Sequence, residues 1–276
     1  MRGSPQAAMT NSPTASDLDR ALHDLAAKAM VLIATDFDGV LAPIRRDRLA
    51  VRPLATTHRE LVRLLDVPGV HVALISGRPL GELRTLAGMP DGAILIGSHG
   101  SEVTGAEFAL THQERTLQEL LTRAALSVAR IRPGAIVEEK PTGVAVHTRR
   151  CRRDVALAAT ADLVLVGARD QNVHVIVGKE VVELLVTHRT KGDAINRLRS
   201  TLDAHATLYL GDDHTDESVF AVMRPSDVSI KVGQGWTAAR YRVDTLGQVA
   251  RVFRTIRTAR LAGPATGRPR LDPPVA

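Results

Sequence analysis

The segment VLIATDFDGVL, residues 31–41, joins a short apolar strand pattern to two aspartates separated by one residue. In open α/β sheets, functional side chains lie at the carboxyl ends of the strands. Asp36 and Asp38 can therefore point into one pocket, and Gly39 allows the backbone to bend tightly beside a ligand. Such a pair of aspartates also occurs in plain turns and helix N-caps. Its meaning depends on the rest of the chain.

Apolar runs alternate with helical patterns in the amino-terminal and carboxyl-terminal parts of the chain. After 31–36, further strands are predicted at 70–76, 93–97, 206–211 and 227–232. Helical patterns occupy 54–66, 191–204, 214–223 and 245–261. Continuous aliphatic runs connected by helices are typical of a parallel sheet buried on both faces.

The middle of the chain has a different pattern. Helices are predicted at 110–130 and 152–166, with short or alternating strands at 135–140, 144–149 and 173–177. We therefore predict an α/β fold with a larger parallel-sheet domain at 16–105 and 186–261 and a smaller α/β unit inserted at 106–185. The ends, 1–15 and 262–276, are predicted to be disordered.

Composition excludes several classes of protein. Of the 276 residues, 44% are hydrophobic and 24% charged, which is ordinary for a globular chain and excludes a wholly disordered one. Cys151 is the only cysteine, so a disulfide framework, a zinc–thiolate site and an iron–sulfur cluster are excluded. Aromatic residues make up 3%, which disfavours recognition of nucleic acid by base stacking.

The net charge of +6 has two interpretations. Part of the excess lies in a row of arginines near the carboxyl end, namely Arg251, Arg254, Arg257, Arg260, Arg268 and Arg270. The row could bind an anionic partner, or it could be a solvated helix face followed by a tail, and the lack of a nucleic-acid motif favours the second reading. No apolar run approaches 18 residues, and the start lacks a secretory signal pattern. We expect a cytoplasmic monomer that binds neither membrane nor nucleic acid.

Two further motifs follow predicted strands or open helices. Ser76-Gly77-Arg78 can present a hydroxyl and backbone N–H groups to phosphate, although a helix N-cap explains it equally well. Lys191 opens a predicted helix, where its charge opposes the helix dipole. That local conflict suggests a ligand, and the plainer alternative is an exposed lysine.

The segment GDDHTDE, residues 211–217, places four acidic side chains directly after an apolar strand. Negative charge of that density beside Asp36 and Asp38 is unfavourable without a cation. Oxygen ligands without cysteine point to Mg²⁺. Asp216 and Glu217 have a plainer reading as acidic residues at a helix start.

Taken together, DxDG at 36–39, SGR at 76–78, KG at 191–192 and GDDxTDE at 211–217 resemble the haloacid dehalogenase superfamily of phosphotransferases. Further segments are similar to the trehalose-6-phosphate phosphatase family. They are GSHG at 97–100, ExK at 138–140, GVAVHxR at 143–149 and GKxVVE at 178–183. The resemblance covers roughly 30–256. It implies a Rossmann-like haloacid dehalogenase core domain at 16–105 and 186–261 and identifies the inserted unit, 106–185, as an α/β cap.

The resemblance implies a role for each matching residue. Asp36 is the nucleophile that forms an aspartyl-phosphate, and Asp38 is the general acid and then the base. Ser76 and Lys191 bind phosphoryl oxygens. The implied Mg²⁺ ligands are Asp36, the backbone carbonyl of Asp38, Asp212 and Asp213. The implied substrate-binding residues are Arg78, His99, Glu138, Lys140, His147, Arg149, Lys179 and Glu183.

The chain departs from the family pattern at three places. Val40 stands where threonine is usual, Thr148 where tyrosine is common, and Leu184-Leu185-Val186 follows Glu183 where the family has Arg-Pro. The expected function is Mg²⁺-dependent hydrolysis of trehalose 6-phosphate, a small-molecule sugar phosphate. Two alternatives stay open: a phosphatase of another sugar phosphate of the sucrose or mannosyl type, and a non-catalytic regulatory homologue.

Overall fold

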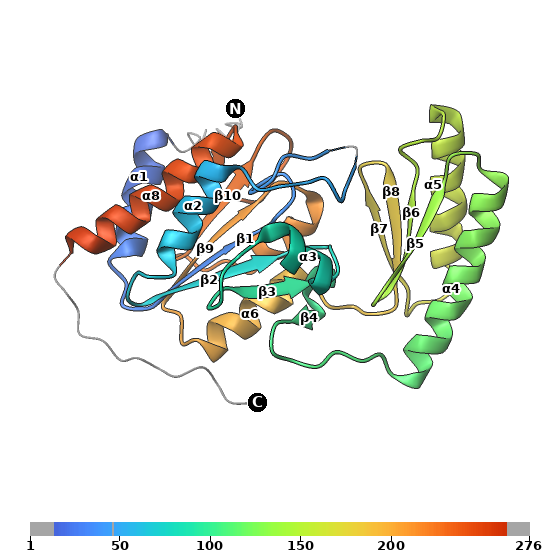
Figure 1. Cartoon of the computed structure of the whole chain (residues 1–276), viewed down its shortest axis with the longest axis horizontal. Helices are drawn as coiled ribbons and strands as arrows, with labels where there is room; N and C mark the ends of the chain where they lie inside the picture. Colours follow the sequence, from blue (N-terminus) through green and yellow to red (C-terminus); the bar gives the residue numbers. More distant parts are fainter. Residues whose placement is uncertain (1–13, 46, 264–276) are drawn as a thin grey trace, which may run out of the picture.

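The computed structural model describes residues 14–45 and 47–263, which form a larger core domain and a smaller cap (Figure 1). The core domain is built on one sheet of strand order β11-β10-β9-β1-β2-β3-β4, in which only the β3–β4 pair is antiparallel. Its strands are β1 (Val31–Thr35), β2 (Val70–Ile75), β3 (Ile94–Gly97), β4 (Glu102–Val103), β9 (Ala206–Gly211), β10 (Val228–Val232) and β11 (Tyr241–Val243).

Helices cover both faces of this sheet because alternate residues of each strand point to opposite sides. On β1, Val31 and Ile33 belong to one apolar cluster, and Leu32 and Ala34 belong to another. The first cluster includes residues of α1 (Ala15–Ala26), α2 (Ala55–Leu64), α3 (Leu80–Ala87) and α8 (Leu246–Ala262). The second includes residues of α6 (Lys191–Thr201) and the one-turn helix α7 (Glu217–Phe220). Short 3₁₀ turns occur at η1 (Ser98–Gly100) and η2 (His214–Asp216).

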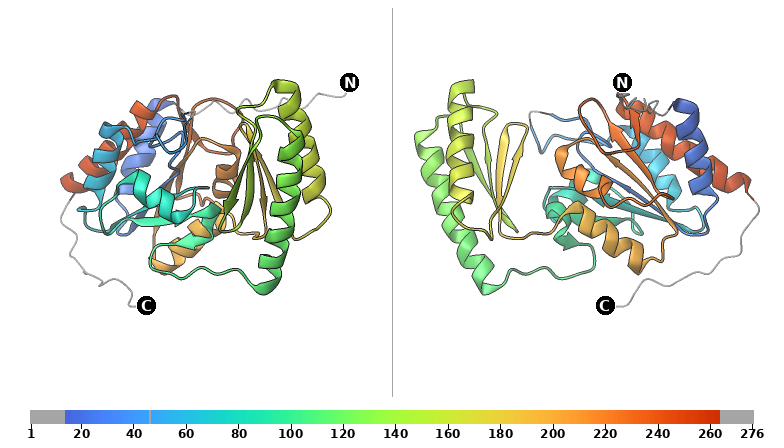
Figure 2. Two further views of the ribbon diagram at one scale, coloured as in Figure 1. Left: turned by 45° about the vertical axis from the view of Figure 1, so that its right-hand side comes forward. Right: turned by 180° about the vertical axis from the view of Figure 1, so that it is seen from behind.

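The cap has a four-stranded antiparallel sheet of order β5-β6-β8-β7. Its elements are α4 (His112–Ile131), β5 (Ile136–Lys140), β6 (Gly143–His147), α5 (Arg153–Gly167), β7 (His174–Gly178) and β8 (Val181–Leu185). Both helices lie on the far side of the sheet, so the other face of the sheet is turned toward the core domain (Figure 2). The inserted unit therefore brings a second layer of side chains over the end of the main sheet.

The predicted fold class is confirmed: a mainly parallel central sheet carries a second, smaller α/β unit. The patterns did not predict β4, β8 and β11. The helix predicted at 214–223 is instead a 3₁₀ turn followed by a single helical turn. The predicted domain boundaries fall between β4 and α4 and directly after β8.

The predicted disordered ends fall largely outside the described residues, as do Arg268 and Arg270. Within the described ranges, α1 begins at Ala15 and α8 ends at Ala262. None of the described helices combines the length and the apolar character that crossing a bilayer requires.

The arginine row on α8 joins this helix to its neighbours. Arg257 donates two hydrogen bonds to the buried Glu60 of α2 at 3.1 and 3.2 Å, and Arg254 lies 3.6 Å from the same carboxylate. Arg251 pairs with Asp19 of α1 at 3.2 Å. Arg260 donates to the backbone carbonyls of Ala26, Lys28, Ala29 and Pro68. The described part of the row is thus engaged in the fold, beyond the solvated face that the sequence suggested.

Glu60 gives the first prediction. Burial disfavours its charge, but the hydrogen bonds and charges of Arg257, Arg254 and Arg63 outweigh burial and lower the pKa below 4.5. A carboxylate whose folded pKa lies below its unfolded value stabilises the protein above the unfolded pKa, and this is lost as the pH falls through the folded pKa. We expect Glu60→Gln to lower the free energy of unfolding by about 2 kcal/mol at pH 7.

The measurement is urea unfolding at pH 7 and at a series of acidic pH values. The exposed Glu119→Gln serves as the matched control. The deficit of Glu60→Gln should shrink below about pH 4.5. A deficit equal to that of Glu119→Gln, or one that does not change with pH, contradicts this account.

Candidate active site

The strand register brings three of the predicted motifs to one edge of the sheet. Thr35, the last residue of β1, is paired with Leu210 of β9 on one side and with Leu74 of β2 on the other. Asp36 continues this register, and its N–H donates to the Leu210 carbonyl at 2.9 Å. Since the neighbouring strands end at Gly211 and Ile75, the DxD, GDD and SGR segments meet at the carboxyl ends of β1, β9 and β2.

Gly39 makes room for this convergence. It has φ +75°, a left-handed conformation that favours glycine. A Cβ at this position would lie 2.1 Å from Oδ2 of Asp212. The glycine of the DxDG motif is thus required both by the turn and by the carboxylate packed against it.

Lys191 lies between two buried carboxylates. Its Nζ is 2.9 Å from Oδ2 of Asp36 and 2.8 Å from Oδ1 of Asp216, and its side chain is 2% exposed. Burial disfavours the charged ammonium, but Asp216 and Asp36 outweigh burial and raise the pKa of Lys191. Thr190 and Asp193 form a capping box at the start of α6, which fixes the helix end that carries Lys191. The local conflict with the helix dipole is therefore resolved by two negative partners.

Asp216 organises the floor of the site. Its Oδ1 accepts from Lys191 and from the Tyr209 hydroxyl at 2.7 Å, and its Oδ2 accepts from the N–H groups of Asp212 and Asp213, each at 2.9 Å. Asp216 has no exposed surface. The sequence predicts Asp216 only as an acidic residue at a helix start. The apolar strand before it does not indicate that Tyr209 donates a hydrogen bond to Asp216.

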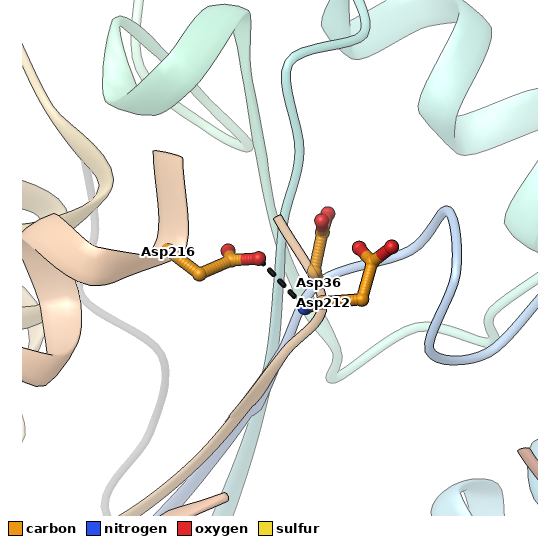
Figure 3. A group of neighbouring side chains, drawn as sticks. All are labelled: Asp36, Asp212 and Asp216. Carbon is orange, nitrogen blue, oxygen red and sulfur yellow. Dashed lines mark hydrogen bonds between the residues drawn. The ribbon is translucent and has the colours of Figure 1, made fainter. Parts of the chain in front are cut away.

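Three carboxylates, those of Asp36, Asp212 and Asp216, lie close enough to hold a metal ion, with their oxygens within 4.8 Å of one another. Figure 3 shows the carboxylates of Asp36 and Asp212 pointing the same way, whereas Asp216 reaches toward the backbone nitrogen of Asp212. Because Asp216 already accepts four hydrogen bonds, Asp36 and Asp212 are the better metal ligands of the three.

The charges of the cluster suit a divalent cation. If ionised, the three carboxylates and the one ammonium carry two net negative charges. Burial and the neighbouring carboxylates raise the pKa of Asp36, against the opposing charge of Lys191. Burial and the charge of Asp216 raise the pKa of Asp212 to about 7. These pKa shifts reflect the unfavourable free energy of burying several carboxylates close together, which a bound cation would offset.

Asp213, predicted as a further ligand, has a different partner. Its Oδ1 accepts from Nδ1 of His214 at 3.3 Å, and this hydrogen bond lowers the pKa of Asp213. Its side chain is 37% exposed, whereas Asp36 is 8% exposed. Asp213 lies at the rim of the acidic cluster rather than inside it.

A cleft of about 1130 Å³ separates the core domain from the cap. Every site residue predicted from the sequence except Glu138 lines it. The lining residues from the core domain are Asp36, Asp38, Ser76, Arg78, His99, Lys191, Asp212 and Asp213, and those from the cap are Lys140, His147, Arg149, Lys179 and Glu183. Segments distant in sequence thus line one cavity.

Glu183 of the cap lies at the centre of one contact between the two units. It accepts from Nζ of Lys140 and, at 2.6 Å, from Nε2 of His99, while Lys140 also donates to the Gly77 carbonyl at 3.3 Å. Burial disfavours its charge, but Lys140 and His99 outweigh burial and lower the pKa of Glu183. Nδ1 of His99 is buried and has no hydrogen-bond partner among the described residues. Gly77 leaves space for the imidazole, since a Cβ there would lie 2.5 Å from the ring.

Glu138 forms a second contact between cap and core domain. It accepts from Nε2 of His147 at 2.7 Å and from Arg48, which lies on the loop after β1. Burial and the charges of Arg48 and Lys140 lower the pKa of His147 to about 4, so this imidazole is neutral at pH 7. Arg149 donates to the Arg45 carbonyl at 2.6 Å. All three cap motifs, at 138–140, 143–149 and 178–183, therefore contact the core domain directly.

Asp38 is held by Arg78. Nε and Nη2 of Arg78 lie 2.6 and 2.9 Å from the two carboxylate oxygens, a two-pronged geometry that only arginine provides. Glu82 on α3 accepts from the remaining Nη1 of Arg78. Sequence reasoning identified Asp38 and Arg78 but neither Glu82 nor Arg48, because their role follows from contacts between separate segments.

The departures from the family pattern lie in buried positions. Val40 has no exposed surface and belongs to the main apolar cluster of the core domain. Leu184 and Val186 belong to the apolar cluster of the cap. Thr148 is buried in the turn after β6, where its N–H donates to the Glu180 carbonyl. These side chains serve packing rather than the cleft.

The sequence of this chain is similar to those of known proteins. Residues 34–245 match the sequence profile of the family described as trehalose-phosphatase. A trehalose-phosphate phosphatase of Mycobacterium avium is 35% identical over 205 residues, which is 70% of this chain and 51% of that relative. A second, from Mycobacterium marinum, is 33% identical over 232 residues, 78% of this chain and 58% of that relative. The chain thus spans about half the length of the curated relatives that it matches.

Solved structures with the same fold include two from C. albicans. The trehalose-6-phosphate phosphatase C-terminal domain has a TM-score of 0.78 at 22% identity, covering 90% of this chain and 99% of that one. The trehalose synthase regulatory protein C-terminal domain has a TM-score of 0.67 at 14% identity, covering 85% and 97%. At these identities the likeness shows the fold alone.

The second prediction concerns Asp216, which we call the buried hub because four donors converge on its carboxylate. Asp216→Asn replaces one carboxylate oxygen by an N–H₂ group, which then faces donors: either Lys191 and Tyr209 or the two backbone N–H groups. We expect the free energy of unfolding to fall by about 3 kcal/mol, as for a broken buried ion pair. Asp213→Asn, at the exposed rim, is the matched control and should change it by less than about 0.5 kcal/mol. Chemical unfolding followed by circular dichroism measures both, and equal losses contradict the assignment of Asp216 as the hub.

Proposed function

Because this chain belongs to the trehalose-phosphatase family, we propose that it hydrolyses trehalose 6-phosphate to trehalose and phosphate. One observation carries the proposal: the acidic cluster and Lys191 form the floor of a cleft whose opposite side is the polar face of the cap. A phosphate ester of a sugar needs both halves, a charged floor for the phosphoryl group and hydrogen-bonding side chains for the hydroxyls.

Asp36 is proposed as the nucleophile. One of its oxygens accepts from the Phe37 N–H at 2.7 Å, and the other contacts Lys191. In the first step a carboxylate oxygen forms a bond to phosphorus while the bond from phosphorus to the sugar oxygen breaks, leaving an aspartyl-phosphate. Mg²⁺, when bound, draws the phosphate to the carboxylates and neutralises its charge. We propose that Asp36, the backbone carbonyl of Asp38 and Asp212 hold the ion, with Asp213 in an outer position.

Asp38 is proposed to move the protons. It donates a proton to the departing sugar oxygen and then accepts one from the water that attacks the aspartyl-phosphate, so that Asp36 and phosphate are released. Its side chain is 32% exposed at the floor of the cleft, which supports a role in contact with substrate. Arg78 holds its carboxylate through two hydrogen bonds.

The other cleft residues are proposed to bind the substrate. Ser76 and Lys191 contact the phosphoryl oxygens, and Lys191 also offsets the charge of Asp36. The proposed sugar-binding residues are Arg78, His99, Glu138, Lys140, His147, Arg149, Lys179 and Glu183. Several of them are paired with one another across the cleft, so a sugar would replace existing hydrogen bonds rather than enter an unpaired site.

Two alternatives differ in what supports them. A phosphatase of another sugar phosphate has the same floor and a different cap, and no contact described above favours it. A regulatory role without catalysis is compatible with the fold, since a regulatory protein domain shares it. The geometry at Asp36, Lys191 and Asp212 favours catalysis, because a non-catalytic protein has no need to gather buried charges of this cost. The cytoplasmic location and the monomeric state stay predictions.

The proposed activity is tested by phosphate release. Trehalose 6-phosphate is offered with Mg²⁺ beside sucrose 6-phosphate and glucose 6-phosphate, with EDTA and Asp36→Asn as controls. We expect preference for trehalose 6-phosphate and a loss of at least about a thousandfold in both controls, since the nucleophile and the cation act together. Mg²⁺-dependent release from another sugar phosphate overturns the substrate. No release from any of the three by the folded protein overturns the catalytic proposal.

Metal binding is tested without turnover. Mg²⁺ at a hundredfold excess over its Kd should stabilise the folded protein by about 2.7 kcal/mol. Asp212→Asn should lose most of this gain, whereas Asp193→Asn, which alters a surface capping box on the other side of Lys191, should retain it. Thermal unfolding with Mg²⁺ and with EDTA measures the difference. An equal gain in Asp212→Asn contradicts the proposed ligand.

A further inference from the structure

A continuous row of charged side chains connects Asp38 to the cap. Asp38 contacts Arg78, Arg78 contacts Glu82, Glu82 contacts Arg48, and Arg48 contacts Glu138 of β5. The signs alternate at every step. The first four residues belong to the core domain and the last to the cap, so the row crosses the cleft.

Within this row, Arg48 joins the two units. Its Nη1 donates to Glu138 and its Nη2 donates to Glu82, so a different nitrogen serves each carboxylate. The Arg48 carbonyl also accepts from Nη1 of Arg78 at 2.9 Å. The backbone of Arg48 therefore contacts Arg78 directly, and the side chain of Arg48 is connected to Arg78 through Glu82.

Glu82 fixes Arg78 from the other side. One Glu82 oxygen accepts from Arg78 and the other from Arg48, and the side chain is 14% exposed. Glu82 lies near the start of α3, a rigid element of the core domain. Without its charge, the two guanidinium groups would face each other with only Asp38 and Glu138 to separate them.

We propose that Arg48 and Glu82 are positioning residues that make closure of the cap and orientation of Asp38 a single event. The proposal rests on the proposed function, in which Asp38 protonates the leaving sugar oxygen. When the cap closes, Glu138 seats Arg48 on Glu82, Glu82 holds Arg78, and Arg78 aligns Asp38. When the cap opens, Arg48 loses one of its two carboxylates and the alignment loosens. Asp38 is then aligned only while the cap is closed.

The proposal distinguishes two kinds of substrate. A sugar oxygen is a poor leaving group and needs a proton from Asp38, whereas p-nitrophenolate leaves without one. The ratio kcat/KM reports the steps up to phosphoryl transfer onto Asp36 and excludes the later attack by water. A loss of alignment therefore lowers kcat/KM for a sugar phosphate and spares kcat/KM for p-nitrophenyl phosphate.

The test compares Arg48→Gln, Glu82→Gln and their double variant with Arg84→Gln, an exposed arginine on α3 that serves as the control. We expect each single variant to lose about tenfold in kcat/KM for trehalose 6-phosphate, mainly in kcat, and less than about twofold for p-nitrophenyl phosphate. The double variant should lose no more than the worse single variant, because both break one row. Arg84→Gln should resemble the unmodified protein with both substrates.

Several outcomes overturn the inference. One is equal loss with both substrates, which indicates a general structural effect. Another is no loss relative to Arg84→Gln, and a third is multiplied losses in the double variant. If a glutamine variant does not fold, Arg48→Lys and Glu82→Asp replace it. The single ammonium of Arg48→Lys cannot donate from two separate nitrogens, so it should show the same selective loss.

A readout without substrate separates this inference from the proposed function. Amide hydrogen exchange at residues 78–83, which carry Arg78 and Glu82, should speed up in Arg48→Gln and not in Arg84→Gln. If the unmodified protein acts on a different sugar phosphate, the proposed substrate is wrong, and the variants are then compared with that sugar phosphate. If exchange at 78–83 is unchanged in Arg48→Gln, the coupling fails whatever the substrate is.

Discussion

The burial of Lys191 between Asp36 and Asp216 is the interaction on which the site depends. A parallel sheet ends its strands at one edge, and this chain places acidic side chains after two adjacent strands there. Such a cluster is stable only if part of its charge is neutralised inside the protein. Lys191 supplies one positive charge, and Asp216 uses its remaining acceptor positions to fix the backbone that carries Asp212. The remaining negative charge is available to a cation.

The cap follows from the same constraint at the opposite side of the cleft. Its helices cover the far face of its sheet, which leaves the near face free to carry polar groups. Those groups are buried by the core domain, so each needs a partner: Glu183 has Lys140 and His99, and Glu138 has His147 and Arg48. The partners come from both units. The cap motion proposed above would exchange defined hydrogen bonds and ion pairs, and it would therefore be connected directly to the catalytic groups.

Electrostatics also holds the far side of the core domain. Part of the positive charge noted in the sequence lies on α8, where it serves contacts within the fold. The arginines of α8 contact Glu60, Asp19 and four backbone carbonyls. A count of charges in the sequence cannot distinguish such structural arginines from a binding surface. The count does not say which carboxylates face the arginines in the folded protein. Here Glu60 is almost fully buried, and its pKa reflects the arginines around it.

The fold class and the segments that carry the acidic and basic motifs could be predicted from the amino-acid sequence. Strand–helix alternation and glycine requirements such as that of Gly39 are local properties of the chain, so they can be read from adjacent residues. The strands β4 and β11 were not predicted because they are two and three residues long, too short to show a period. The strand β8 was not predicted because the buried Glu183 interrupts its apolar run. That Asp216 is the buried hub and that Asp213 lies at the rim became evident from the three-dimensional contacts. The same holds for Arg48 and Glu82, which connect Asp38 to the cap. These roles arise from charges on separate elements brought within hydrogen-bonding distance, and the cost of burying a charge depends on every group around it.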